Sequence, residues 1–193
     1  MYKKQMILQR LTSYILLAVA VLVFVYSLGI MTDLYDSLNL ISTYPEGHRN
    51  YVEGASIFND MQPFNRELTA AGIALILTAV ALFAFKSHDR RKYYVANYIT
   101  IGVNAVANIV VSIWALINVF AYRAQFLSIN FERLAEVAAK YDVAYTDSTF
   151  WFDISIPVFA LVFIATALSI ANLVFKLVLM NAEKKLVTEG KEA

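Results

Sequence analysis

Four long apolar blocks follow one another along the chain, and none of them contains an Asp, Glu, Lys or Arg. They cover residues 11–32, 68–85, 93–122 and 154–175, with lengths of 22, 18, 30 and 22 residues. A helix needs about 20 apolar residues to cross a hydrocarbon layer of about 30 Å. An amphipathic helix of a soluble protein would instead show a charged stripe at helical spacing. The pattern therefore predicts four transmembrane helices, the first of them a spanning helix rather than a cleaved signal peptide.

The basic residues divide unevenly between the two sides of these helices. Eleven fall on the side of both termini and of the second connection: Lys3, Lys4, Arg10, Lys86, Arg90, Arg91, Lys92, Lys176, Lys184, Lys185 and Lys191. Five fall in the connections 33–67 and 123–153: Arg49, Arg66, Arg123, Arg133 and Lys140. Because cytoplasmic flanks collect Lys and Arg, both termini are predicted to be cytoplasmic, and 33–67 and 123–153 are predicted to be outer loops.

The second outer loop contains a further helical pattern. Phe126, Ile129, Leu134, Val137 and Tyr141 recur near helical spacing. Such spacing indicates an amphipathic helix. We expect a short helix over residues 130–141.

Composition adds limits on the chemistry. The hydrophobic fraction is 60%, against roughly 45–50% in soluble domains. The chain has no cysteine and two histidines, His48 and His88, which the predicted topology places on opposite sides of the membrane. With a net charge of +1 it shows no basic excess of the kind that nucleic-acid binding requires. We expect one transmembrane domain over residues 1–193, no enzymatic activity, no cofactor, no metal site and no nucleic-acid partner.

One face of the third helix is polar. Its members are Asn97, Asn104, Asn108, Ser112 and Asn118. At about 100° per residue the first four fall within about 80° of one another, and Asn118 widens the arc. An amide facing lipid loses its hydrogen bonds to water without replacement. This polar face is therefore predicted to contact protein, either as interhelical hydrogen bonds within the chain or to a partner, or else to line a water-filled path.

The interiors of the four predicted spans contain no ionisable side chain. Transporters and membrane enzymes usually have a charged side chain deep in the membrane. Burying a charge there costs free energy, so such residues are found mainly where function requires them. This favours a structural or regulatory subunit over a self-sufficient transporter.

Three strings carry a resemblance to a known family: SLGIMTDLYD at 27–36, NAVAN at 104–108 and YTDSTFWFD at 145–153. They resemble four-helix membrane proteins of Gram-positive anaerobes that are associated with carbohydrate ABC-transporter systems. The resemblance implies an auxiliary role beside ABC permeases and a solute-binding protein. It implies no catalytic or binding residue.

Together these observations predict an all-α, integral membrane four-helix bundle of the cell membrane. The expected function is a non-catalytic accessory subunit of a membrane transport complex, whose partners are other membrane subunits and membrane lipid. The resemblance implies that this complex is a carbohydrate ABC importer. The alternative is a small channel or carrier lined by the polar face of the third helix.

The orientation can be tested with single cysteines, since the chain has none. Cysteines at Ser56 and Ala144 should react with an impermeant maleimide in intact cells, and one at Ser87 should not. Labelling of Ser87 together with protection of the other two would reverse the topology.

Overall fold

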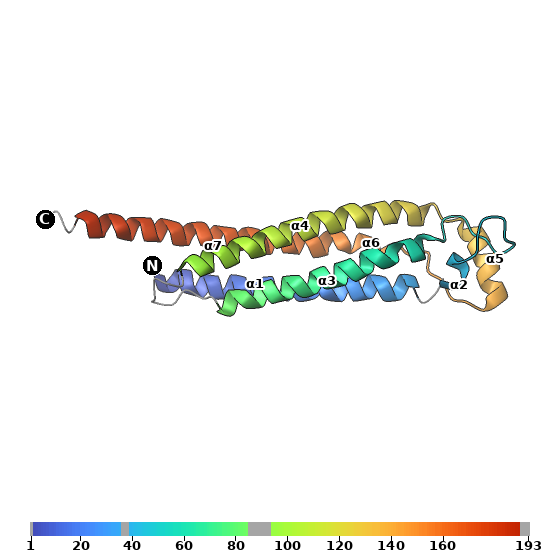
Figure 1. Ribbon diagram of the computed structural model, residues 1–193, viewed down its shortest axis with the longest axis horizontal. Helices are drawn as coiled ribbons and strands as arrows, with labels where there is room; N and C mark the ends of the chain where they lie inside the picture. The colour runs from blue at the N-terminus through green and yellow to red at the C-terminus, as the bar shows by residue number, and fades with distance from the viewer. Residues whose placement is uncertain (1, 36–38, 85–93, 190–193) are drawn as a thin grey trace. The chain divides into compact units, whose positions relative to one another are not determined.

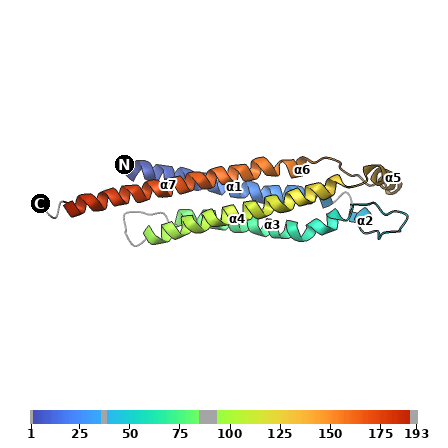
Figure 2. The same ribbon diagram turned by 90° about the horizontal axis from the view of Figure 1, so that it is seen from above.

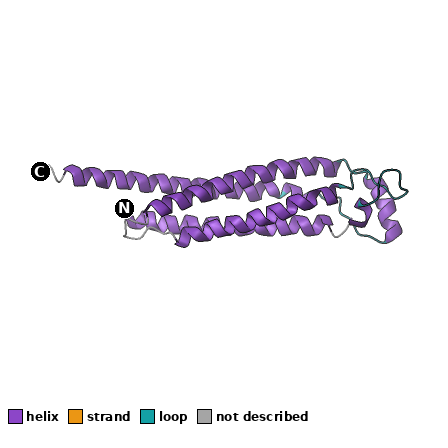
Figure 3. Ribbon diagram, viewed as in Figure 1, coloured by secondary structure: helices purple, strands orange, loops and turns teal. Residues whose placement is uncertain are grey.

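Every regular element of the described chain is an α-helix. The computed structural model describes residues 2–35, 39–84 and 94–189, and these ranges contain no strand (Figure 3). Four helices are long: α1 (Tyr2–Tyr35), α3 (Ile57–Ala84), α4 (Tyr94–Leu127) and α7 (Ser155–Glu189) (Figure 1). Three are short: α2 (Asn39–Ser42), α5 (Phe131–Tyr141) and α6 (Phe150–Asp153). The predicted all-α class is confirmed.

Each long helix carries a stretch that is long and apolar enough to cross a membrane: Lys4–Ile30, Ile57–Ala84, Asn97–Leu127 and Phe150–Ala182. This indicates a multi-pass membrane protein. The helices extend beyond the apolar blocks, because backbone hydrogen bonds hold a helix together whether its side chains are apolar or not. One such extension is the start of α3, which lies inside the predicted first outer loop and includes Pro63. The predicted connection 86–92 lies outside the described residues.

Contacts divide the chain into two compact units. Unit 1 consists of Met1–Val21, Ala74–Val110 and Ala160–Ala193, and unit 2 of Leu22–Ile73 and Val111–Phe159. Each unit contains segments of all four long helices.

The interior of unit 1 is about half polar. Among its described residues, eleven buried side chains are polar or charged: Gln5, Gln9, Thr12, Ser13, Asn97, Asn104, Asn108, Thr166, Ser169, Asn172 and Lys176. Ten are apolar: Leu16, Val19, Ala20, Leu75, Ala79, Leu82, Ile101, Ala105, Val162 and Ala165. Buried polar groups need hydrogen-bond partners inside the protein. This interior is therefore specified by polar contacts as much as by packing.

The interior of unit 2 is built mainly from large apolar side chains. Phe126 and Phe152 lie with ring centroids 5.2 Å apart. Tyr26 meets Phe159 edge to face at 5.9 Å. Burying a ring of this size stabilises a fold by about 1.5–3 kcal/mol in water. Inside lipid the gain comes from close packing instead.

One end of unit 2 is a folded cap formed by α2, the segment 43–56 and α5 (Figure 2). The Asn130 side chain accepts the Arg133 N–H at 3.0 Å and so caps α5. Asp142 ends the helix in the left-handed conformation, with φ 52°. α5 buries one face, formed by Leu134, Val137 and Ala138. This helix lies within the range 130–141 that the spacing of apolar residues predicts.

A buried asparagine ties the cap together. The Asn50 amide donates to the Tyr141 hydroxyl at 2.5 Å and accepts from Lys140 Nζ at 3.3 Å. Tyr44 stacks on His48, with ring centroids 4.5 Å apart. A hydrogen bond between the hydroxyls of Tyr44 and Tyr141 raises the pKa of Tyr44 and lowers that of Tyr141. The segment 43–56 is therefore a structured part of the protein and not a simple linker.

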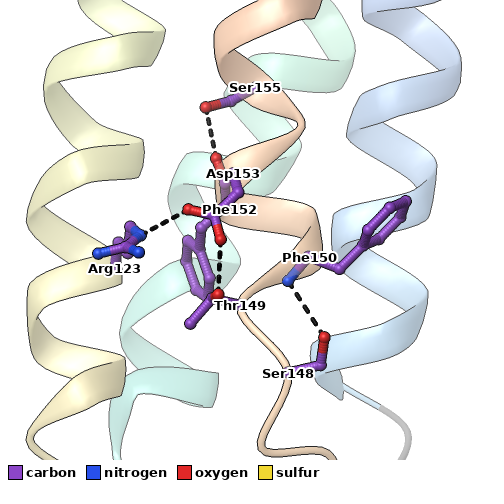
Figure 4. A network of polar contacts seen from close by, with 7 residues as sticks. All are labelled: Arg123, Ser148, Thr149, Phe150, Phe152, Asp153 and Ser155. Carbon is purple, nitrogen blue, oxygen red and sulfur yellow. Dashed lines mark hydrogen bonds and ion pairs between the residues drawn. The ribbon is translucent and has the colours of Figure 1, made fainter.

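The chain breaks its helical path between α6 and α7 at Ile154. Pro157 explains the break, because it has no N–H to donate to the Asp153 carbonyl and its ring crowds that group. The Asp153 carboxylate instead accepts from Arg123 Nε of α4 at 2.8 Å and from the Thr149 hydroxyl at 2.6 Å (Figure 4). These contacts hold the start of α7 against the end of α4 within unit 2.

Gly29 of α1 provides a test of packing in unit 2. A Cβ at this position would lie 2.1 Å from the Trp151 ring, so Gly29→Ala must displace the ring. The alanine gains about 1 kcal/mol of helix propensity, but overpacking costs about 1–3 kcal/mol. We expect a lower melting temperature in detergent and a shift in tryptophan fluorescence.

Gly102→Ala is the matched control, because nothing lies within 4 Å of a Cβ there and the residue is also helical. It should leave the melting temperature unchanged or raise it. Equal behaviour of the two variants would contradict the packing of Trp151 against α1.

Candidate functional site

The polar face of α4 lies largely inside the protein. Asn97, Asn104, Asn108 and Ser112 are all buried, with exposed fractions of 2% or less. Asn118 is only half-buried, and its amide donates to the Trp114 carbonyl of its own helix at 2.8 Å. The Asn118 amide therefore has a hydrogen-bond acceptor in its own helix backbone. The other four side chains need hydrogen-bond partners among the side chains or backbone groups around them. Asn97, Asn104 and Asn108 belong to unit 1, and Ser112 and Asn118 belong to unit 2.

Within unit 1 two of these asparagines form a chain of hydrogen bonds that reaches α3. Asn108 Nδ2 donates to Asn104 Oδ1 at 3.1 Å. Asn104 Nδ2 donates to the Thr78 hydroxyl at 3.0 Å, and that hydroxyl donates to the Leu75 carbonyl at 3.0 Å. The chain ends on a backbone acceptor, so both amide nitrogens and the hydroxyl have an acceptor. It connects α4 to α3.

A second group of hydrogen bonds connects α1 to α7. Gln5 Nε2 lies 3.3 Å from both Gln9 Oε1 and Asn172 Oδ1. The hydroxyls of Thr12 and Ser13 donate to the Gln9 carbonyl at 3.0 and 2.8 Å. Gln9 Nε2 is buried without a hydrogen-bond partner. The Gln9 side-chain nitrogen of α1 is therefore a buried donor without an acceptor.

Lys176 joins the polar interior from α7 and connects it to α4. Its Nζ donates to Asn97 Oδ1 at 2.7 Å and lies 5.1 Å from the centre of the Tyr98 ring. The Tyr98 hydroxyl in turn donates to Met180 Sδ. Lys176 is 1% exposed. A cation over an aromatic face and against an amide oxygen is stabilised electrostatically in a site that excludes water.

The burial of Lys176 corrects the expectation that no ionisable side chain lies within the spans. Because Lys176 directly follows the block 154–175, the sequence pattern predicts that it lies on the cytoplasmic flank. The apolar stretch of this helix in fact continues to Ala182, so Lys176 lies inside it. The run Leu177–Met180 that follows the lysine was the signal that the block did not end there.

Three other polar side chains of the fourth span bond within their own segment or to α1. Ser155 is buried and donates to Phe152 O at 2.6 Å (Figure 4). Thr166 is buried and donates to Val162 O at 2.8 Å. Asn172 accepts from Gln5 of α1. Gln5, Gln9 and Lys176 were not predicted as members of the site. Gln5 and Gln9, four residues apart and thus on one helix face, were a usable signal.

Chemically, the site can hold helices together or bind a polar group, and each cross-helix hydrogen bond contributes about 0.6 kcal/mol on average in a membrane. Among the described residues, no group of three or more His, Asp or Glu side chains could hold a metal ion.

Comparison with known proteins identifies no relative. No protein-family model matches the chain, and no curated protein or solved structure is significantly similar to it. The resemblance of the three strings therefore stays an expectation.

The contact between Lys176 and Asn97 predicts a coupled effect on stability. Lys176→Met leaves Asn97 Oδ1 without this donor, which should cost about 1–3 kcal/mol. Asn97→Leu added to it should cost less than the two single changes together. Thermal unfolding in detergent measures this, with Lys4→Met, an exposed lysine on α1 of the same unit, as the control. Strict additivity would show that the two side chains do not stabilise each other.

Proposed function

We propose that the chain is a non-catalytic accessory subunit of a larger transport complex in the cell membrane. The observation that carries the proposal is the use of the polar interior of unit 1. Its hydrogen bonds run from helix to helix, as in Asn104–Thr78, Gln5–Asn172 and Lys176–Asn97. Side chains engaged in this way brace a bundle, which suits a subunit that positions other proteins.

The folded cap of unit 2 supports the same role. A subunit that only filled lipid would need short connections between its helices. This chain instead builds the cap around Asn50 and a buried face of α5, and exposes Tyr141 and Tyr145 beside it. Tyrosine is enriched at protein contact surfaces. In the proposed complex this cap contacts a solute-binding protein on the outer side.

The transport part of the proposal rests on the resemblance of residues 27–36, 104–108 and 145–153 to proteins associated with carbohydrate ABC transporters. The partners proposed on this ground are ABC permeases and their ATPase. The orientation with both termini in the cytoplasm rests on the distribution of Lys and Arg.

A small carrier or channel is the second candidate, and Lys176 is the observation that favours it. Ionisable side chains buried in membrane segments commonly mark a solute or proton path. The unused Gln9 Nε2 donor adds a group that a polar solute could bind. In this alternative the polar interior of unit 1 is the path itself.

Purification in mild detergent separates the two functions. An accessory subunit should co-purify with larger membrane proteins, identified by mass spectrometry. Deletion of its gene should lower the abundance or activity of those partners. Liposomes that contain the protein alone should take up radiolabelled glucose or maltose no faster than empty ones.

Uptake by the protein alone, abolished by Lys176→Met but not by Lys4→Met, would establish the carrier and overturn the accessory role. Elution as a homo-oligomer without any other protein would also contradict the proposal.

A further inference from the structure

Asn65 of α3 lies in the interior of unit 2 with its whole side-chain amide unused. The residue is 0% exposed, and neither Nδ2 nor Oδ1 has a hydrogen-bond partner. Native proteins rarely leave both atoms of a buried amide unsatisfied, because the group loses its hydrogen bonds to water without replacement. Full burial also prevents lipid or a neighbouring protein from reaching the amide. Its partner must therefore lie inside unit 2.

Contacts between α1 and α3 show which part of α1 lies opposite Asn65. The Thr69 hydroxyl lies 3.2 Å from the Ser27 hydroxyl and also donates to the Asn65 carbonyl at 2.8 Å. Gly72 of α3 lies against the Phe24 backbone of α1, so the two helices are antiparallel here and Asn65 falls opposite the α1 turn that follows Ser27.

Tyr26, which precedes Ser27 in α1, carries the second unpartnered group. Its ring packs on Phe159, 5.9 Å away, and its hydroxyl lies beside Ser155, one turn earlier in α7. The Tyr26 hydroxyl is nevertheless buried without a hydrogen-bond partner.

A third unpartnered group comes from α4. The Ser112 hydroxyl is buried and makes no hydrogen bond. Ser112 precedes Trp114 by two residues, and the Trp114 ring lies 5.2 Å from that of Phe64, the neighbour of Asn65. Three of the four long helices thus direct an unused polar group into the interior of unit 2.

We propose that Asn65, Tyr26 and Ser112 form an internal binding site for a small neutral molecule that both donates and accepts hydrogen bonds. The amide supplies two N–H donors and an acceptor oxygen, and each hydroxyl supplies a donor and an acceptor. None of the three groups carries a charge, so the site suits a neutral ligand and not an ion. A buried water molecule, which usually makes two to four hydrogen bonds, has this chemistry. A small hydroxylic solute such as glycerol shares it.

Substitutions by apolar residues of similar shape test the site, because their effect depends on whether it is occupied. Asn65→Leu and Tyr26→Phe each remove hydrogen-bonding groups. If the groups bind a ligand, each change should lower the melting temperature by about 2–4 °C or more. If the groups are truly unsatisfied, the same changes should leave the melting temperature unchanged or raise it. That result would overturn the proposal.

The double variant separates a shared ligand from two independent effects. Loss of one ligand can occur only once, so the two changes together should lower the melting temperature by less than the sum of the single effects. A fully additive result would contradict a common site. Asn118→Leu is the matched control, since its amide already bonds to Trp114 O, and it should combine additively with Tyr26→Phe.

If leucine at position 65 prevents folding for steric reasons, a second cycle of variants tests the site without that substitution. Tyr26→Phe and Ser112→Ala each delete a single oxygen atom and add none. Coupling between these two supports the site, and additivity or a rise in melting temperature overturns it.

Glycerol added to the unfolding experiment distinguishes the two ligands. A glycerol-dependent rise in melting temperature that is larger for the unmodified protein than for Tyr26→Phe identifies a hydroxylic solute. An equal rise, together with coupling between the variants, identifies bound water. The test concerns unit 2 alone, so its outcome leaves the accessory role unaffected.

Discussion

A polar group that leaves water for a membrane must find its hydrogen-bond partner within protein, and the arrangement of α4 follows from this constraint. One side of the helix carries Asn97, Asn104, Asn108 and Ser112, all buried. The other side exposes branched aliphatic residues: Ile99, Val103, Val106, Val110, Ile113 and Ile117. The first side cannot face lipid without losing hydrogen bonds, and the second side has nothing to lose there. The rotation of α4 about its own axis is therefore determined by its amides.

The two units meet this constraint by different means. In lipid, burial of apolar surface gives helices no driving force to associate, so packing and polar contacts must supply it. Unit 1 relies on hydrogen bonds between side chains of neighbouring helices. Unit 2 relies on close contact, with Gly29 admitting the Trp151 ring and Gly72 allowing α3 to approach the Phe24 backbone of α1. The cap adds a conventional small core at one end of unit 2, where α5 buries Leu134 and Val137.

The sequence predicts the four long helices and the inward direction of the asparagines, because both depend on local pattern alone. Charge-free blocks of 18–30 residues, close to or above the length of a bilayer crossing, have few alternative structures. Helical spacing places Asn104 and Asn108 on one face. The helix ends were missed because charge marks where apolar sequence stops, whereas hydrogen bonding decides where a helix stops. Asn65 was missed for a related reason. It precedes Arg66 and Glu67 in a predicted loop, and only the packing of α3 against α1 shows that its side chain is buried.

Lys176 shows how side-chain direction changes the meaning of a charge at the end of an apolar helix. A lysine in such a position usually extends its long stem to place the ammonium group among lipid headgroups. Lys176 instead turns inward to Asn97 and the Tyr98 ring. It therefore no longer counts as evidence for orientation, yet ten basic residues on the predicted cytoplasmic side still outnumber five on the other. The predicted orientation is therefore the same without Lys176. The same lysine gives α7 a hydrogen bond to α4.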